Sequence, residues 1–242
     1  MTSTSNRLEA VNLAVQRGGK PILDGISFSV AAGEVYGLLG GNGVGKSTTL
    51  LTFLGFIDPV GGEVRVNGKE VGDSVGDARQ SIAYLPESSS LYEHLNAREN
   101  LHYFLSLAGS RAEDAAIEAA LDRVALPADA RQRKLGDYSK GMRQKVAIAL
   151  AILRDTDTLL LDEPTSGLDP TAIDEFHDLV RDLADAGKAV LMVTHDVYGA
   201  CQVADRIGLL KERQLVGQFS APEGGRIDTE EVHAAFSKGV QS

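Results

Sequence analysis

One glycine-rich segment carries the residue types that best suit the binding of phosphate. It consists of Gly40, Gly41, Asn42, Gly43, Val44, Gly45, Lys46 and Ser47, and Thr48 follows it. Glycines let backbone N–H groups turn inward around phosphate oxygens, because no Cβ stands in the way. In this pattern the lysine reaches the β- and γ-phosphates and the serine hydroxyl can ligate Mg²⁺. The segment predicts a nucleoside triphosphate site, and a plain turn between a strand and a helix is the alternative.

A pair of acids follows an apolar run later in the chain. Residues 158–161 read Thr-Leu-Leu-Leu, and Asp162 and Glu163 come directly after them. Charges at the end of a buried strand are costly unless they meet a cation or a reacting group. We therefore expect Asp162 to hold the Mg²⁺ shell and Glu163 to accept a proton from the attacking water. A solvated pair at a strand end is the alternative, and the phosphate-binding segment upstream disfavours it.

The segment of residues 138–144 narrows the class of nucleotide-binding protein. It reads Tyr-Ser-Lys-Gly-Met-Arg-Gln, and it resembles the signature of ABC transporter ATP-binding domains, usually Leu-Ser-Gly-Gly-Gln. Ser139 is a good N-cap for a helix, and the N–H groups behind it form an anion site. The order of the three segments is similar to that of the family, and the resemblance extends over about residues 7–218.

The resemblance implies further roles for individual residues. Ser-Gly-Leu-Asp at residues 166–169 resembles the D-loop, and His195, after an apolar run, resembles the switch histidine that contacts the γ-phosphate. In this family ATP is held between the phosphate-binding loop of one domain and the signature of another. The implied catalytic residues are Lys46, Glu163 and His195. The implied contacts to the ATP of a partner domain are Ser139, Gly141 and Asp169.

Three positions depart from the commonest family sequence. Arg17 stands where an adenine-stacking aromatic residue is frequent; its guanidinium could stack on the purine or be solvated, and both readings stay open. Glu87 stands where the family usually has a glutamine that completes the Mg²⁺ shell, and its carboxylate could still offer oxygen. Lys140 and Met142 replace a glycine and a glutamine of the signature, where the charge of Lys140 could attract phosphate.

The resemblance also implies partners. One phosphate-binding loop and one signature suggest a head-to-tail homodimer that holds two ATP molecules and works with an integral membrane permease. We expect the chain at the cytoplasmic face of the membrane, bound through that permease, and most similar to the ATPases of type-2 exporters. A permease helix is expected to dock on residues 88–100, where Leu91, Tyr92 and Leu95 offer apolar contact. The alternatives are a soluble ABC ATPase of chromosomes or ribosomes and, more distantly, a nucleotide kinase.

The elements that must position these residues alternate between strand and helix patterns, which is typical of an α/β fold. Apolar runs predict strands over residues 7–16, 25–30, 34–39, 158–162, 189–194, 206–211 and 214–219. A helix is expected over 46–56, and helical spacing at 98–107 and 113–124 predicts a helical subdomain inserted at about 91–153. We expect a P-loop NTPase core with an antiparallel β subdomain, one ATPase domain over residues 1–220, and a short tail over 221–242.

The composition excludes several other classes of protein. A formal net charge of −10 disfavours a nucleic-acid-binding surface, which needs clustered Lys and Arg. The longest apolar run, residues 146–153, is far shorter than the roughly 20 residues of a membrane-spanning helix. The first ten residues lack the apolar core of a signal peptide, and the lone Cys201 cannot form an internal disulfide.

Overall fold

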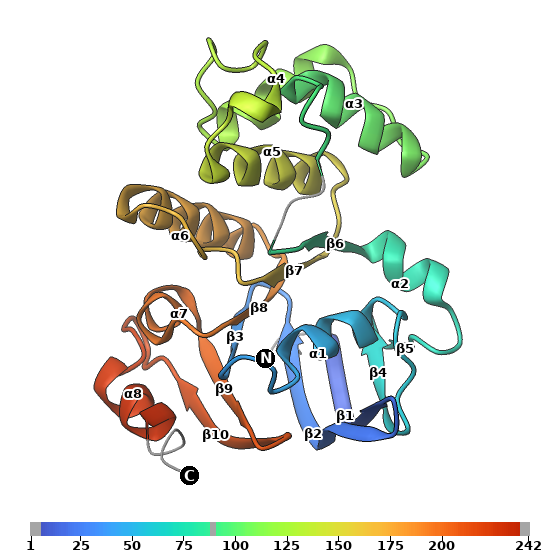
Figure 1. The fold of residues 1–242 in the computed structure, drawn as a ribbon, viewed down its shortest axis with the longest axis vertical. Coiled ribbons are helices and arrows are strands. Elements are labelled where there is room, and N and C mark those ends of the chain that lie inside the picture. The colour runs from blue at the N-terminus through green and yellow to red at the C-terminus, as the bar shows by residue number, and fades with distance from the viewer. Residues whose placement is uncertain (1–5, 88–90, 238–242) are drawn as a thin grey trace.

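The strands form two sheets in the computed structural model, which describes residues 6–87 and 91–237 (Figure 1). The strands are β1 Asn6–Arg17, β2 Lys20–Ala31, β3 Val35–Leu39, β4 Gly61–Val66, β5 Lys69–Glu70, β6 Ile82–Leu85, β7 Thr158–Asp162, β8 Ala189–Thr194, β9 Arg206–Lys211 and β10 Gln214–Ser220. The helices are α1 Lys46–Phe53, α2 Val75–Ser81, α3 Ala97–Leu107, α4 Asp114–Arg123, the 3-10 turn Leu135–Asp137, α5 Lys140–Leu153, α6 Pro170–Asp185, α7 Val197–Val203 and α8 Thr229–Ser237.

The larger sheet has the strand order β10-β9-β3-β8-β7-β6, and the smaller, antiparallel sheet has the order β2-β1-β4-β5. Strands β6, β7, β8, β3 and β9 are parallel neighbours, and β10 closes the sheet as an antiparallel hairpin with β9. All residues of β3, β7 and β8 are buried. Because the carboxyl ends of parallel strands meet at one edge, the segments that follow β3, β6, β7 and β8 converge there.

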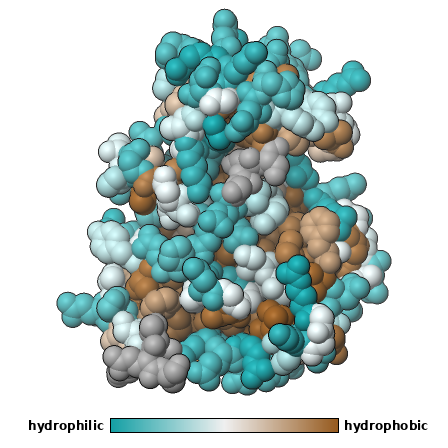
Figure 2. Space-filling view, viewed as in Figure 1, coloured by the Kyte–Doolittle hydropathy of each residue, from teal (hydrophilic) through white to brown (hydrophobic). Residues whose placement is uncertain are grey.

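The larger sheet separates two hydrophobic cores, as successive residues of β8 show. Val190 and Met192 face the core shared with α5, α6 and α7. Leu191 and Val193 face the core shared with the antiparallel sheet and α1. Figure 2 shows that the exposed face of the molecule is largely hydrophilic over the helices at the top, with more hydrophobic residues lower down over the sheets. Within the described ranges, no helix is both long and apolar enough to span a bilayer.

Between β6 and β7 the chain builds a helical insertion from α3, α4 and α5, seen at the top of Figure 1. Arg131 ties it together: the guanidinium pairs with Glu118 at 2.8 Å and with Asp122 at 2.5 Å. Glu118 also pairs with Arg98 of α3. The hydrogen bonds from Arg98 and Arg131 lower the pKa of Glu118 to about 2. Charge therefore links α3 and α4, which both also pack on α5.

The predicted fold class is confirmed, and every predicted strand is present, with β7 and β8 as expected; β2 begins well before its predicted start, and β4, β5 and β6 were not predicted. The first helix is shorter than expected. It ends at Phe53 because Gly55 takes the left-handed φ of +64, and a side chain at position 55 would also lie too close to Val75, at 2.7 Å. The segment expected as a tail contains α8, whose Val232 is fully buried in the core beside α7.

Candidate nucleotide site

The phosphate-binding segment forms a tight loop between β3 and α1, where its glycines are sterically required. Gly43 and Gly45 have φ values of +77° and +114°, a region of backbone conformation that residues with a side chain rarely adopt. A Cβ on Gly40 would lie 2.6 Å from the carbonyl oxygen of Leu210, and one on Gly45 would lie 2.7 Å from Leu23 of β2. The loop is a close-fitting cradle of backbone at the start of α1, as anion binding requires.

Lys46 points its ammonium back into this cradle. Its side chain is only 6% exposed, and Nζ donates to the carbonyl oxygens of Gly40 at 2.8 Å and Gly41 at 3.0 Å. Nζ also forms an ion pair with Glu163 Oε1 at 3.1 Å. The ammonium of the phosphate-binding loop and the acid that follows β7 are therefore in direct contact, although 117 positions separate them, counted as 163 minus 46.

Glu163 is held from both sides. Its second carboxylate oxygen, Oε2, contacts His195 Nδ1 at 2.8 Å and accepts from the backbone N–H of His195 at 3.2 Å. The residue sits at φ +45 and donates its own N–H to Val193 O at 2.9 Å. A left-handed conformation at a non-glycine residue is uncommon and tends to occur at functional sites. The carboxylate is fixed in orientation, as a general base must be.

Asp162, the neighbour of Glu163, is buried: only 7% of the residue is exposed. Ser47 Oγ donates to Oδ1 at 3.0 Å, and Tyr84 OH donates to Oδ2 at 3.3 Å. Burial raises the pKa of Asp162, the two hydrogen bonds act in the opposite direction, and the charges of Glu163 and Glu87 raise it further. Within the described part of the chain, Asp162 has no ion pair with a basic side chain. A buried carboxylate of this kind favours a bound cation.

The oxygens around Asp162 suit a hard cation such as Mg²⁺. Ser47, Asp162 and Glu87 offer hydroxyl and carboxylate oxygens, which Mg²⁺ prefers. Glu87 is exposed just after β6, and its charge acts on Asp162. No group of three or more His, Cys, Asp or Glu side chains among the described residues forms a metal cage. Since Mg²⁺ usually keeps waters and takes phosphate oxygens from a bound nucleotide, the donor set fits an ion that binds together with the nucleotide.

The signature segment begins α5 and lies against the start of α6. Ser139 caps α5 and accepts from Met142 N at 3.2 Å, and Asp169 caps α6 and accepts from Ala172 N at 3.0 Å. A Cβ on Gly141 would lie 3.4 Å from Ala172, so the two helix starts are close neighbours. Among the described residues, no hydrogen bond or ion pair joins Ser139 or Asp169 to the phosphate-binding loop of the same chain.

Arg17 is exposed at the end of β1, in the hairpin with β2. The same hairpin brings Ile22 and Leu23 against Gly45, so it borders the phosphate-binding loop. Both readings of Arg17, purine stacking and solvation, remain predictions. No role for Tyr84 was predicted, yet its hydroxyl donates a hydrogen bond to Asp162 in the structure. Tyr84 lies three residues before Glu87, on a strand that runs beside β7. That spacing could have indicated a residue close to Asp162.

Comparison with known proteins places the chain among similar sequences and folds. Residues 23–166 match the family described as ABC transporter. The chain is 36% identical over 208 residues to the Nod factor export ATP-binding protein I of Burkholderia orbicola, covering 86% of this chain and 68% of that protein. It is 36% identical over 245 residues to the daunorubicin/doxorubicin resistance ATP-binding protein DrrA of Streptomyces peucetius, covering 98% and 74%. A solved ATP binding subunit of an ABC transporter superposes with TM-score 0.81 at 28% identity, covering 95% and 99%.

Proposed function

The chain belongs to the ABC transporter family of ATP-binding proteins, and from that membership we propose that it powers export through a separate membrane permease. Members of the family bind and hydrolyse ATP, and this chain is such a subunit. The relatives named for Nod factor export and for drug resistance support export as the direction of transport. The permease holds the subunit at the cytoplasmic face of the membrane in this proposal.

The observation that carries the proposed chemistry is the contact between the phosphate-binding loop and the acids after β7. The backbone cradle and Lys46 bind the β- and γ-phosphates, which take the place of Glu163 as the partner of Lys46. Glu163 then accepts a proton from the attacking water, and His195 keeps its carboxylate oriented. Ser47, Asp162 and Glu87 would hold Mg²⁺, which would neutralise charge on the phosphates when bound.

We propose that two copies form each nucleotide site. Ser139 and Asp169 lie at exposed helix starts and are not bonded to the loop of their own chain within the described residues. The N–H groups at the start of a helix such as α5 can bind an anion supplied from outside the chain. A head-to-tail homodimer would place this start, with Ser139, Lys140 and Gly141, over the ATP held by the partner's loop.

A mixing experiment tests the two-copy site. Ser139→Ala should leave ATP binding to the monomer unchanged but abolish most hydrolysis, because the serine acts on the other subunit's nucleotide. Lys46→Ala chains should also be inactive. Mixing the two variants should restore hydrolysis, measured as phosphate release, since each mixed pair has one site built from an intact loop and an intact signature.

Two controls keep this result interpretable. Ser106→Ala, on an exposed position of α3, should hydrolyse ATP at the normal rate. A strictly monomeric preparation that hydrolyses ATP at the full rate, or mixed variants that stay inactive despite pairing, would show that the site is not shared.

The permease is proposed to dock on the aromatic residues that precede and begin the helical insertion. Of the expected docking residues, positions 88–90 lie outside the described ranges, and Leu91 and Leu95 are partly buried. Tyr92 is 40% exposed; its ring stacks on Phe104 with centroids 5.7 Å apart, and its hydroxyl lies 3.3 Å from that of Tyr103. An exposed aromatic group of this kind suits the apolar face of a partner helix.

Charge substitution tests this docking surface. Tyr92→Glu should abolish co-purification with the permease from detergent while the free subunit keeps its ATPase activity, because the change lies outside the nucleotide site. The matched control is Tyr198→Glu, an even more exposed tyrosine (66%) on α7. Equal association of both variants with the permease would place the docking surface elsewhere. Loss of the soluble fold in Tyr92→Glu would show that Tyr92 serves to pack the helical insertion, which also contradicts docking.

A further inference from the structure

Tyr84 occupies an unusual place, on the edge strand of the larger sheet but in contact with its catalytic edge. It lies on β6, in register with Leu160 of β7, so Asp162 is two residues further along the neighbouring strand. Its hydroxyl donates to Asp162 Oδ2 at 3.3 Å. The ring packs against the core on the side of α1 and the antiparallel sheet. Burial raises the pKa of Tyr84 to about 12, so at neutral pH the hydroxyl is a proton donor.

The hydrogen bonds on Asp162 come from two different elements. Ser47 of α1 donates to one carboxylate oxygen and Tyr84 of β6 to the other. Two donors on opposite oxygens fix the plane of the carboxyl group, which a single donor would leave free to rotate. A carboxylate has about four lone-pair sites, so both hydrogen bonds leave room for a further contact to a cation or its water.

We propose that Tyr84 is a positioning residue that orients Asp162 toward Mg²⁺ and thereby sets the affinity of the nucleotide site for the metal. The inference rests on the proposed role of Asp162 in holding Mg²⁺. Groups that orient a metal ligand commonly change metal affinity by about 10–100-fold when they are removed. Tyr84 acts through Asp162 and does not touch the nucleotide in this proposal.

The strand that carries Tyr84, β6, lies at the edge of the larger sheet. The strand has one sheet neighbour, β7, and its other edge is free of strand pairing within the described residues. Tyr84 lies on β6 and Glu87 lies two residues after the end of that strand, and both act on Asp162. A small shift of β6 relative to β7 would move both groups together, so metal affinity would respond to the position of the strand that leads into the helical insertion.

Binding of a fluorescent ATP analogue, measured once in excess Mg²⁺ and once in EDTA, tests the role of Tyr84. The dissociation constant in EDTA divided by that in Mg²⁺ gives the contribution of the metal to ATP binding. Tyr84→Phe keeps the ring and removes only the hydroxyl; it should reduce this ratio by about 10-fold, leave the affinity in EDTA unchanged and leave the Tm of the nucleotide-free protein unchanged. Tyr103→Phe is the matched control, since it removes an exposed hydroxyl bonded to Tyr92, and its ratio should equal that of the unaltered chain.

The other outcomes separate the possible failures. A Tyr84→Phe ratio equal to that of the control would overturn the positioning role. An equal loss of affinity in Mg²⁺ and in EDTA would show that the hydroxyl supports the fold of the whole site, which also contradicts the proposal. Asp162→Asn should lose most of the metal contribution; if it retains all of it, the assignment of Mg²⁺ to Asp162 is wrong, and the inference about Tyr84 falls with it.

Discussion

Replacing Glu163 by Gln is expected to lower the rate of ATP hydrolysis by about 10²–10⁴-fold, which is the usual contribution of a positioned base. The amide keeps the size of the side chain but cannot accept the proton of the attacking water. ATP binding should persist, because the cradle and Lys46 are intact, and the paired state with bound ATP should accumulate. Phosphate release gives the rate, and size-exclusion chromatography with ATP gives the paired fraction.

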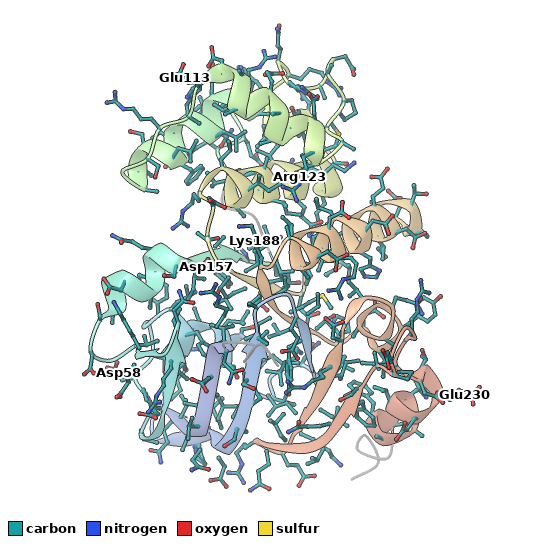
Figure 3. The ribbon with its side chains drawn as sticks, turned by 180° about the vertical axis from the view of Figure 1, so that it is seen from behind. Asp58, Glu113, Arg123, Asp157, Lys188 and Glu230 are labelled. Atoms are coloured by element: carbon teal, nitrogen blue, oxygen red, sulfur yellow. The ribbon has the colours of Figure 1, made fainter. Side chains whose placement is uncertain are left out.

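A surface glutamate provides the control for this substitution. Glu230→Gln changes an exposed residue of α8, which Figure 3 shows at the far end of the molecule from the helical insertion. Its rate should be normal. Hydrolysis by Glu163→Gln at a rate close to that of the control would remove Glu163 as the base and point to another acceptor for the proton.

Lys46→Ala is expected to weaken ATP binding itself by about 10–100-fold, since a hydrogen bond to a charged group contributes roughly 1.5–3 kcal/mol. The substitution removes the ammonium that lies between two loop carbonyls and Glu163. Hydrolysis should fall as well, because the γ-phosphate loses its main cationic contact. Equilibrium binding of a fluorescent ATP analogue distinguishes this result from that of Glu163→Gln, where binding remains.

Lys188→Ala is the matched lysine control. Lys188 precedes β8 and pairs with Asp155 at 3.2 Å, and Figure 3 shows it near Asp157, at the starts of β8 and β7. These starts lie at the edge of the sheet opposite the nucleotide site, so ATP affinity should not change. An unchanged affinity in Lys46→Ala would mean that the backbone cradle alone binds the phosphates.

The sequence predicted β7 and β8 because each is a continuous apolar run that ends in a polar residue, but it did not predict β6, which carries Tyr84. β7 and β8 are fully buried, and their patterns leave little choice of boundary. Helix α1 was overextended, because an apolar residue at position 56 continues the helical pattern although Gly55 has already ended it. α8 was missed for a different reason: it buries Val232 against the core, and such tertiary contact outweighs a weak local pattern.

The residues of the candidate site were predicted one by one, but their mutual contacts were not. The ion pair of Lys46 with Glu163 and the contact of Glu163 with His195 depend on the order of strands in the sheet, which motif spacing does not give. The same is true of Tyr84, which reaches Asp162 only because β6 lies beside β7. The left-handed backbone conformation of Glu163 could not be predicted from the residue type either, since glutamate rarely adopts it.

The ion pair of Lys46 with Glu163 gives the protein a built-in competitor for its own ligand. The carboxylate is tethered beside the ammonium, so its effective concentration there is on the order of millimolar or higher. A small anion such as inorganic phosphate must displace the Glu163 carboxylate from the Lys46 ammonium, and it makes few contacts of its own with the loop. A triphosphate brings many contacts at once along the backbone cradle. The ion pair is therefore expected to favour ligands that make several contacts with the loop at once, as a triphosphate does, over ligands that make few.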